Sequence, residues 1–337
     1  MNLNERIQLF ASLGRMLRDQ PESLQDVIRE ASWQNSWFDE KNIRMALSNI
    51  AEQYLDEEKL SAWIHSYALK EPVPKTVGIV MAGNLPLVGF HDLLCVFMAG
   101  HRSMVKLSQK DQVLWPAIRE MLIRENPACA DYFLIADRLQ GIDAIIATGS
   151  DNSARYFHFY FDRYPHIIRK NRVGVAVLSG GESGEELVAL GRDVFSYYGL
   201  GCRNVSSLFL PEGYDFTDLL ESWDRFSGIL DHNSYRNNFD YNMTLFIMNK
   251  VSYRESRSTL LLENDDLVSR IGSVHYQFYD SLERVSGKLK ALKDKIQVVV
   301  SARPIPGLTT VMPGKAQSPR LEDYADEVDT IKFLDQL

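Results

Sequence analysis

The chain has 337 residues and a formal net charge of -8, with 45% hydrophobic and 24% charged residues. This length exceeds what one hydrophobic core usually organises, so two domains, or one large α/β domain with additions, are expected. The 45 acidic residues outnumber the 37 basic ones, so no basic field is available for a phosphate backbone, which argues against nucleic acid as a partner.

The sequence also disfavours membranes, disulfides and metals. No apolar run approaches the roughly 20 residues that span a bilayer, and the N-terminus lacks the regions of a standard signal peptide. We therefore expect no integral membrane segment and a cytoplasmic location. Cys95, Cys129 and Cys202 form no CxxC pair, and the seven histidines show no ligand spacing such as HExxH, so reduced thiols and no metal site are expected.

The first 70 residues are expected to form consecutive helices. Apolar residues recur at helical spacing in two stripes: Ile7, Phe10, Leu13 and Leu17, then Ile43, Leu47, Ile50 and Leu55. Pro72 and Pro74 end this pattern, and short β-branched runs then alternate with helical stretches. Such alternation is typical of βαβ units and a parallel sheet.

Two alternating regions come next, which predicts the α/β class with two doubly wound lobes. In the first, we expect strands at 77–81, 103–107, 132–135, 144–147 and 173–178, and helices near 87–99, 112–125 and 151–161. In the second, we expect strands at 206–210, 243–248, 274–279 and 297–301, and helices at 216–230 and 281–292. The tail over 304–337 is rich in Pro, Gly and acidic residues and is expected to wrap the surface or a partner.

A helix is also predicted over 185–198, just before Cys202. Ser183 and Glu186 have the spacing of a capping box at its start, and Gly199 and Gly201 are expected to end it. Glycines let the backbone turn tightly and approach a ligand closely. The helix and its glycine turn are therefore expected to present the side chain of Cys202.

Cys202 is the candidate nucleophile. Arg203 places a positive charge next to it, which favours the thiolate, and the thiolate is the nucleophilic form. A lone cysteine is more often a small buried hydrophobe. From the local residues alone, both interpretations stay open.

Three further segments are candidates: two lie at the carboxyl ends of predicted strands, where open α/β sheets bind ligands, and one places a lysine inside a predicted strand. Asn84 is either a turn residue or an amide donor to an oxyanion. Lys106 either snorkels from an apolar strand or contacts a sugar or phosphate. Thr148, Gly149 and Ser150 either cap a helix or bind a pyrophosphate at its N-terminus.

Two conspicuous segments are not expected to bind a cofactor. The glycine-rich stretch 179–184 matches neither GxGxxG nor a Walker sequence, and Glu182, Glu185 and Glu186 would repel phosphate. The aromatic cluster over 156–164 is expected to serve packing in the core or an interface.

Taken in chain order, five motifs resemble those of the aldehyde dehydrogenase superfamily, specifically its LuxC-like acyl-CoA reductase branch. They are Gly83–Pro86, Ala99–Lys106, Ala147–Ser150, Leu178–Gly181 and Gly201–Cys202. The resemblance runs from about residue 70 to the C-terminus and includes Pro313–Arg320. It implies an aldehyde dehydrogenase-like fold, with a nucleotide-binding domain over 71–178 joined by the N-terminal helices, a catalytic domain over 179–303, and a homodimer or larger homo-oligomer.

The resemblance also implies roles for the candidate residues. Cys202 matches the superfamily nucleophile, and Asn84 matches the asparagine whose amide helps to form the oxyanion hole. Lys106 matches the lysine that contacts the adenosine ribose of the cofactor, NAD(H) or NADP(H). The segment Thr148–Ser150 matches the one that lies against the nicotinamide nucleotide.

One departure from the superfamily pattern concerns the general base. Hydrolytic members carry a glutamate where this chain has Leu178, although Glu182 lies nearby and could substitute. Without that base, an acyl-enzyme should hydrolyse poorly and should instead exchange its acyl group with a thiol or accept hydride. The expected activity is therefore NAD(P)H-dependent reduction of an acyl-CoA or acyl-protein thioester to an aldehyde through acyl-Cys202. A cofactor-independent thiol acyltransferase and a non-catalytic subunit of the same fold are the alternatives.

Overall fold

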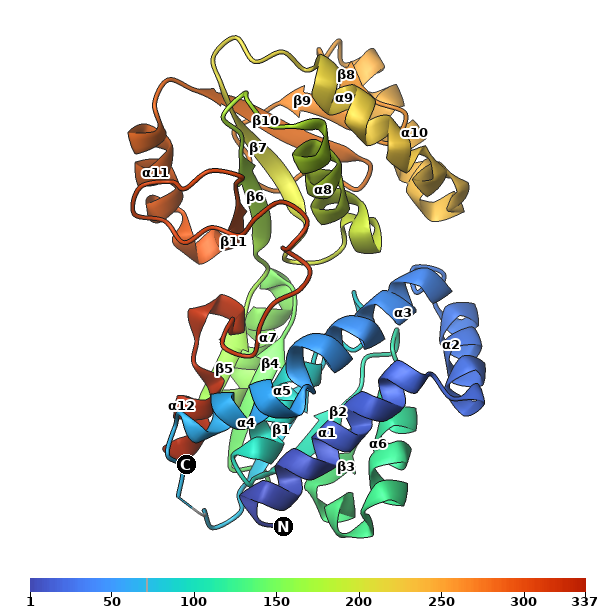
Figure 1. Cartoon of the computed structure of the whole chain (residues 1–337), viewed down its shortest axis with the longest axis vertical. Coiled ribbons are helices and arrows are strands. Elements are labelled where there is room, and N and C mark those ends of the chain that lie inside the picture. Colours follow the sequence, from blue (N-terminus) through green and yellow to red (C-terminus); the bar gives the residue numbers. More distant parts are fainter. Residues whose placement is uncertain (71) are drawn as a thin grey trace. The chain divides into compact units, whose positions relative to one another are not determined.

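The computed structural model describes residues 1–70 and 72–337, which form two compact units. The first unit contains Met1–Asn171 and Pro319–Leu337, and the second contains Arg172–Ser318 (Figure 1). Each has a mainly parallel sheet with helices, which confirms the predicted α/β class. Among the described residues, no helix is both long enough and apolar enough to cross a membrane.

The predicted N-terminal helices are confirmed. They are α1 (Leu3–Asp19), α2 (Glu22–Gln34), α3 (Glu40–Asn49), a π-helical turn (Ile50–Tyr54) and α4 (Glu57–His65). Asn2, Asp39 and Asp56 accept hydrogen bonds from backbone amides at the starts of α1, α3 and α4, so these helices begin at side-chain caps. All eight residues of the two apolar stripes are buried in one core cluster of the first unit.

The sheet of the first unit is parallel, with the order β3-β2-β1-β4-β5. Its elements are β1 (Thr76–Val80), α5 (Phe90–Met98), β2 (Arg102–Lys106), α6 (Leu114–Glu125), β3 (Phe133–Ile135), β4 (Ala144–Thr148), α7 (Asp151–Phe161) and β5 (His166–Arg169). The chain builds outward from β1 through β2 and β3, then resumes on the other side of β1 with β4. The strand order therefore reverses between β1 and β4, and ligands of open α/β sheets bind at the carboxyl ends of such strands.

The strand expected at 173–178 lies in the second sheet, as β6 (Val173–Val177), and the boundary between the units falls between Asn171 and Arg172. The first sheet has β3 at one edge and β5 at the other, and the sequence analysis missed β5. Arg169 ends β5 yet is buried, because it pairs with Asp92 and donates to the Thr330 hydroxyl at 3.2 Å. These partners are distant in sequence, so local patterning does not reveal the strand.

The second unit has the sheet order β11-β6-β7-β10-β9-β8, with β8 antiparallel to β9 and the other pairs parallel. Its further strands are β7 (Val205–Pro211), β8 (Arg254–Glu255), β9 (Leu260–Glu263), β10 (Ser273–Tyr279) and β11 (Ile296–Val300). Its helices are α8 (Gly184–Phe195), α9 (Thr217–Trp223), α10 (Asn233–Met248) and α11 (Leu282–Ala291). Residues of α8 and α9 share one buried cluster and residues of α11 share another, as expected of a sheet covered on both faces.

The strand predicted at 243–248 is wrong, because these residues form the last turns of α10. A short apolar run fits a strand or a helix equally well. In the structure Phe246 is buried against β9, whereas Ile247 and Met248 are exposed at the helix end. Strand β9 was missed, although it is the partner of β10.

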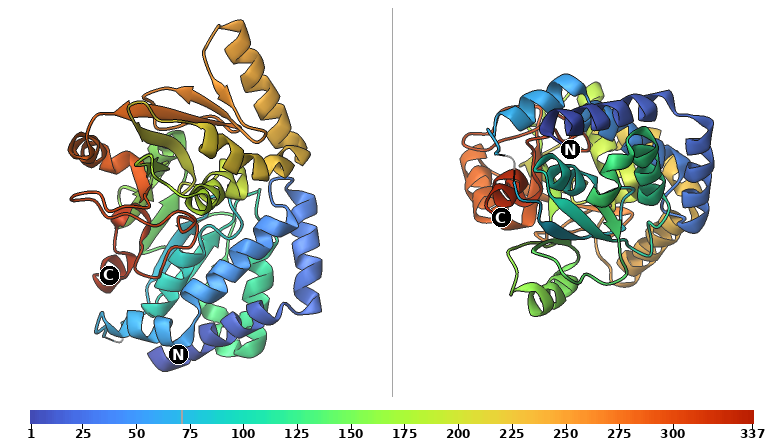
Figure 2. Two further views of the ribbon diagram at one scale, coloured as in Figure 1. Left: turned by 45° about the horizontal axis from the view of Figure 1, so that its top comes forward. Right: turned by 90° about the horizontal axis from the view of Figure 1, so that it is seen from below.

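The tail over 304–337 contributes to both units. Val311 exchanges backbone hydrogen bonds with the residues around the end of β11 in the second unit. In the first unit, Trp63 Nε1 donates to the Tyr324 hydroxyl at 3.0 Å, and α12 (Thr330–Asp335) packs against α5. Figure 2 follows this segment, in dark red, to the C-terminus. The tail was expected to wrap the surface or a partner, but its last part also belongs to the core of the first unit, because Ile331 and Leu334 of α12 are completely buried.

Candidate active site

The three cysteines differ in exposure. Cys202, between α8 and β7 in the second unit, is partly exposed, whereas Cys95 and Cys129 are buried in the first unit. Burial raises the pKa of the Cys129 thiol to about 11, and burial raises the pKa of Cys95 well above its ordinary value. A buried neutral thiol is a poor nucleophile, and of the three thiols only that of Cys202 is partly exposed.

The helix before Cys202 begins as predicted. Ser183 Oγ accepts a hydrogen bond from the Glu186 amide at 3.2 Å, and Glu186 Oε2 accepts one from the Ser183 amide at 2.8 Å. This is the capping box read from the sequence.

The same helix ends earlier than predicted, at Phe195. Tyr197 and Tyr198 adopt the left-handed conformation, with φ of 52° and 58°, and Gly199 comes next with φ of 76°. Bulky residues rarely adopt this conformation, and such residues persist only where the surroundings enforce it. The turn that leads to Cys202 therefore begins at the tyrosines, ahead of the glycines.

Asn204 holds this turn, and the sequence analysis gave it no role. Its side chain is 2% exposed. Its Nδ2 lies within hydrogen-bonding distance of three backbone oxygens at the end of α8, those of Asp193 at 3.0 Å, Val194 at 3.2 Å and Ser196 at 2.8 Å. Its Oδ1 accepts a hydrogen bond from the Gly201 amide at 2.8 Å. One side-chain amide thus satisfies the helix end and fixes the residue that precedes Cys202.

Leu178 packs into the core of the second unit. Its side chain belongs to the cluster beneath α8 and is 2% exposed, while its carbonyl accepts a hydrogen bond from the Tyr279 hydroxyl at 2.7 Å. The resemblance implies that hydrolytic members of the superfamily carry their general base at the position of Leu178. A buried alkyl group occupies this position here.

Glu182 is engaged in its own turn. One carboxylate oxygen accepts hydrogen bonds from the Ser179 amide and hydroxyl at 2.6 and 2.7 Å, and the other accepts one from the Gly180 amide at 3.1 Å. These donors would have to be given up before Glu182 could move to activate a water. The amides that a phosphate would need are also occupied, in agreement with the rejection of 179–184 as a phosphate loop.

In the first unit, the predicted residues gather at one edge of the sheet. Lys106 ends β2, Thr148 ends β4, and Asn84 lies just after β1. Val80 of β1 pairs with Lys106 on one side and with Ala147 on the other. The three candidate residues therefore lie at the carboxyl ends of adjacent parallel strands, next to the point where the strand order reverses.

The segment after β4 caps α7 and packs closely against it. Ser150 Oγ accepts a hydrogen bond from the Ser153 amide at 3.2 Å, which confirms the N-cap interpretation. A Cβ at Gly149 would lie 2.8 Å from Ser153 Cβ and 2.9 Å from Phe157 Cε2, so no larger residue fits here without displacement. Gly149 therefore packs tightly against the first turns of α7.

A cavity of about 230 Å³ opens beside Lys106. It is lined by Val80, Lys106 and Leu139, and by Tyr156, Phe157, Tyr160 and Phe161 of α7. Phe157 and Phe161 pack against the sheet as expected of the aromatic cluster, but Tyr156, Phe159 and Tyr160 are exposed, contrary to a purely packing role. An apolar cavity with an exposed lysine at its rim suits a flat aromatic ring that carries a polar or anionic group.

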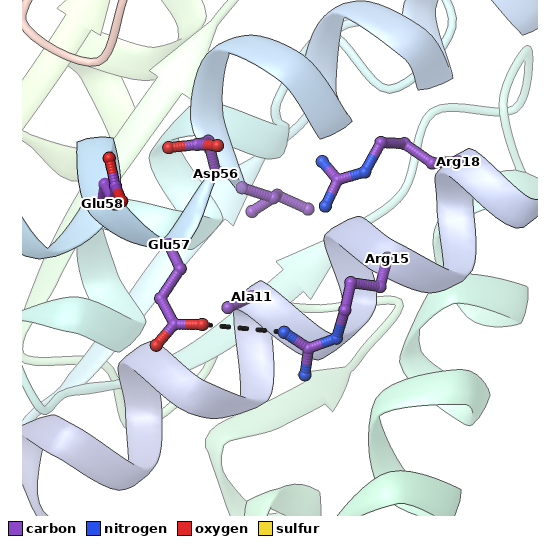
Figure 3. A pocket seen from close by; sticks show the side chains of 7 residues that line it. Ala11, Arg15, Arg18, Asp56, Glu57 and Glu58 are labelled. Carbon is purple, nitrogen blue, oxygen red and sulfur yellow. Dashed lines mark ion pairs between the residues drawn. The ribbon is translucent and has the colours of Figure 1, made fainter.

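A larger cavity, of about 450 Å³, contains none of the predicted site residues. It is lined by Ala11, Arg15, Arg18, Leu55, Asp56, Glu57 and Glu58 of α1 and the start of α4 (Figure 3). Arg15 lies 3.6 Å from Glu57, and Arg18 donates to the Ala51 carbonyl at 3.0 Å. Both arginines of this cavity therefore have partners within the N-terminal helices.

The structure thus brings Asn84, Lys106 and Thr148 to one sheet edge of the first unit, whereas Cys202 belongs to the second unit.

No protein-family model matches the chain, and no curated protein matches it in sequence. Solved structures do match its fold. An NAD-dependent aldehyde dehydrogenase from Sinorhizobium meliloti matches at a TM-score of 0.65 and 13% identity, over 89% of this chain and 70% of its own. Aldehyde dehydrogenase 21 from Physcomitrella patens, in complex with the product succinate, matches at 0.71 and 10%, over 100% of this chain and 84% of its own.

A mutant of aldehyde dehydrogenase C from Pseudomonas syringae, in complex with NAD+ and octanal, matches at a TM-score of 0.65 and 11% identity, over 89% of this chain and 72% of its own. The chain therefore has the aldehyde dehydrogenase fold, with two α/β lobes, as the resemblance implied. At these identities the likeness concerns the fold alone.

Proposed function

We propose that the chain is an NAD(P)H-dependent reductase that converts an acyl-CoA or acyl-protein thioester into an aldehyde through an acyl group on Cys202. The observation that carries the proposal is a partly exposed thiol in a loop clamped by Asn204, in a lobe where Leu178 replaces the hydrolytic base. The fold, whose solved examples include NAD-dependent aldehyde dehydrogenases, supports the oxidoreductase class.

In the proposed reaction, the Cys202 thiolate attacks the thioester carbonyl to form a new carbon–sulfur bond. The Cys202 backbone N–H donates a hydrogen bond to the oxyanion, and the sequence resemblance assigns the second donor to the Asn84 amide. The bond to the leaving group then breaks, the leaving group departs as a thiolate that takes a proton from solvent, and an acyl thioester remains on Cys202.

Bound NAD(P)H supplies the hydride that reduces this acyl group. The resulting thiohemiacetal oxyanion is held by the same two donors. Its collapse breaks the carbon–sulfur bond, releases the aldehyde and returns Cys202 as the thiolate.

The carboxyl edge of the first sheet fits the cofactor chemically. The exposed Lys106 stands at the rim of an apolar cavity, so it would be able to contact the ribose or phosphate of an adenosine held there. At the end of β4, Gly149 packs closely against Ser153 and Phe157 of α7. Thr148 and Ser150 are assigned to the nicotinamide half of the cofactor.

The competing acyltransferase function would use the same Cys202 chemistry without a nicotinamide. A panel of acyl-CoA chain lengths incubated with the full chain and NADH or NADPH separates the candidates. We expect oxidation of the reduced cofactor with aldehyde formation, and loss of both in Cys202→Ser. Acyl transfer between thiols without any cofactor oxidation would instead favour the acyltransferase, and a Cys202 that is never acylated would favour a non-catalytic subunit.

A further inference from the structure

Two histidines and one aspartate converge at the turn between α7 and β5. His158 lies on α7, Asp162 lies directly after that helix, and His166 begins β5. One ligand atom from each lies within 4.8 Å of the others. The spacing of four residues between successive members is visible in the sequence, but the turn is what brings His166 back to the helix end.

Both histidines of this cluster lie near the same carboxylate oxygen. Asp162 Oδ1 lies 2.8 Å from His158 Nδ1 and 3.8 Å from His166 Nε2. The two imidazole rings are nearly perpendicular, at 86° and with centroids 5.7 Å apart. Both rings thus place a nitrogen near the same carboxylate oxygen without stacking on each other.

The tautomer of His166 is fixed by the backbone. His166 Nδ1 lies 2.9 Å from the Tyr164 carbonyl oxygen, which can only accept, so Nδ1 carries the proton. In the neutral ring, Nε2 then presents a lone pair toward Asp162. Metal-binding histidines are commonly oriented in this way, with the second ring nitrogen donating to a carbonyl.

We propose that His158, Asp162 and His166 form a binding site for one divalent transition-metal ion of the zinc class. A tetrahedral zinc ion with bonds near 2.0 Å separates its ligand atoms by roughly 3.3 Å. The two separations from Asp162 Oδ1, 2.8 and 3.8 Å, bracket that value, and the three ligand atoms all lie within 4.8 Å of one another. Two imidazoles and one carboxylate suit zinc, cobalt or nickel, whereas magnesium and calcium require more oxygen ligands.

The surroundings admit an ion. The three side chains are 44%, 62% and 29% exposed in chain order, so the ion can enter from solvent and complete its coordination with water. The right-hand view of Figure 2 shows α7, in light green, projecting from the rest of its unit. The neighbouring Arg163 places its guanidinium over the Tyr164 ring, 4.9 Å from the centroid.

The ion would tie the last turn of α7 to the edge strand of the sheet. Tyr156 and Tyr160 of the same helix line the cavity beside Lys106. An occupied site would therefore stiffen one wall of that cavity. The binding itself does not depend on any catalytic function of the chain.

The test is a titration of the full chain, stripped of metal by a chelator, with Zn2+ followed by calorimetry and with Co2+ followed by visible absorption. We expect one ion to bind per chain at this site. The absorption bands of bound Co2+ should be those of nitrogen and oxygen ligands, with no charge-transfer band from a thiolate. Asp162→Asn and His166→Gln should each weaken binding at least about tenfold, because even the partners of metal ligands are worth that much.

His65→Gln is the matched control. His65 is an exposed histidine of the same unit, and its Nδ1 lies within hydrogen-bonding distance of Ser61 in the same helix. The His65→Gln variant should bind Zn2+ as tightly as the wild type does. Zn2+ should raise the melting temperatures of the wild type and of this control, but not those of Asp162→Asn and His166→Gln. The proposal is overturned if the wild type binds no ion, if the ligand variants bind equally well, or if cobalt shows a thiolate band that places it on a cysteine.

Discussion

Asn204 Oδ1 accepts a hydrogen bond from the Gly201 amide at 2.8 Å, while the nitrogen of the same side chain reaches the carbonyls at the end of α8. The residue before Cys202 is thereby linked to the helix end through one buried amide. Both halves of the amide are used, so neither a carboxylate nor an apolar side chain can replace it.

Asn204→Asp should therefore destabilise the second unit. The change removes the donor to the helix carbonyls and places a carboxylate against them, and leaving buried polar groups unsatisfied costs about 1–3 kcal/mol. Urea unfolding measures the loss, and iodoacetamide labelling reports whether Cys202 has moved. Asn249→Asp is the control, because Asn249 is exposed and donates to one helix carbonyl, that of Leu245. Equal effects of the two changes would contradict the clamp.

Limited iodoacetamide should modify Cys202 before the other thiols. Cys95 and Cys129 are buried and their thiols are held neutral, so they react only after local unfolding. Mass-spectrometric mapping at neutral pH checks the order. Earlier modification of Cys95 or Cys129 would refute it.

Asn84→Ala should lower kcat about a hundredfold or more, because an oxyanion-hole donor acts on charge that develops in the transition state. The affinity for the reduced cofactor should stay nearly the same. Steady-state kinetics and a fluorescence titration of cofactor separate the two quantities. An unchanged kcat would leave Asn84 as a turn residue after β1.

An acyl-CoA offered without reduced cofactor should leave an acyl group on Cys202 that hydrolyses slowly. Free CoA should discharge it by thiol exchange, which needs no water-activating carboxylate. Intact-protein mass spectrometry over time tracks the adduct. Glu182→Gln is the decisive comparison: the slow hydrolysis should be the same as in the wild type, whereas a further decrease would identify Glu182 as the base.

Leu178→Glu is less informative than the sequence suggests. The motif alone predicts that a carboxylate at this position would accelerate hydrolysis. Leu178 is 2% exposed within the core beneath α8, so the carboxylate would be desolvated and its pKa raised. Loss of stability is the expected first effect, and circular dichroism during thermal unfolding would detect it.

The stability of the second unit should fall as the pH rises from about 4 to 7 through the titration of Asp193. Burial raises the pKa of this carboxyl to about 7, although the Gly314 and Ala316 amides donate to it at 2.6 and 3.0 Å. Because the folded-state pKa lies above the ordinary value, the native state retains a proton that the unfolded chain releases in this window. Stability is therefore greatest below it and declines through it.

The matched variant for this pH dependence is Asp193→Asn, which removes the titration. Its unfolding free energy should vary less between about pH 4 and pH 8 than that of the wild type. In the first unit, burial raises the pKa of Asp111 to about 6 and adds a dependence of the same sign, which the variant leaves in place. Parallel profiles for the two proteins would contradict the assignment to Asp193.

Most of the fold could be predicted from the sequence because its signals are local. Apolar periodicity identified the N-terminal helices, and β-branched runs identified four strands of each sheet to within a few residues. What escaped depends on distant partners. Strand β5 ends in an arginine that becomes a buried residue only through Asp92 and Thr330.

The candidate site shows the same division. The capping box joins Ser183 to Glu186, three positions later, and was predicted in full. The clamp of Asn204 was missed, because its partners become known only when α8 ends at Phe195 and the left-handed tyrosines turn the chain. A polar residue shortly after a Gly-x-Gly turn was the one available signal.

The division of the tail between the units has a consequence for synthesis of the protein on the ribosome. The second unit is one continuous stretch, Arg172–Ser318, so all of its strands have emerged before the first unit is complete. The first unit needs Ile331 and Leu334, which are fully buried in its core. Residues 1–171 therefore emerge first and lack the packing of α12 against α5 until the whole second unit has been translated. During that interval the nascent first unit exposes an apolar surface that a chaperone can recognise.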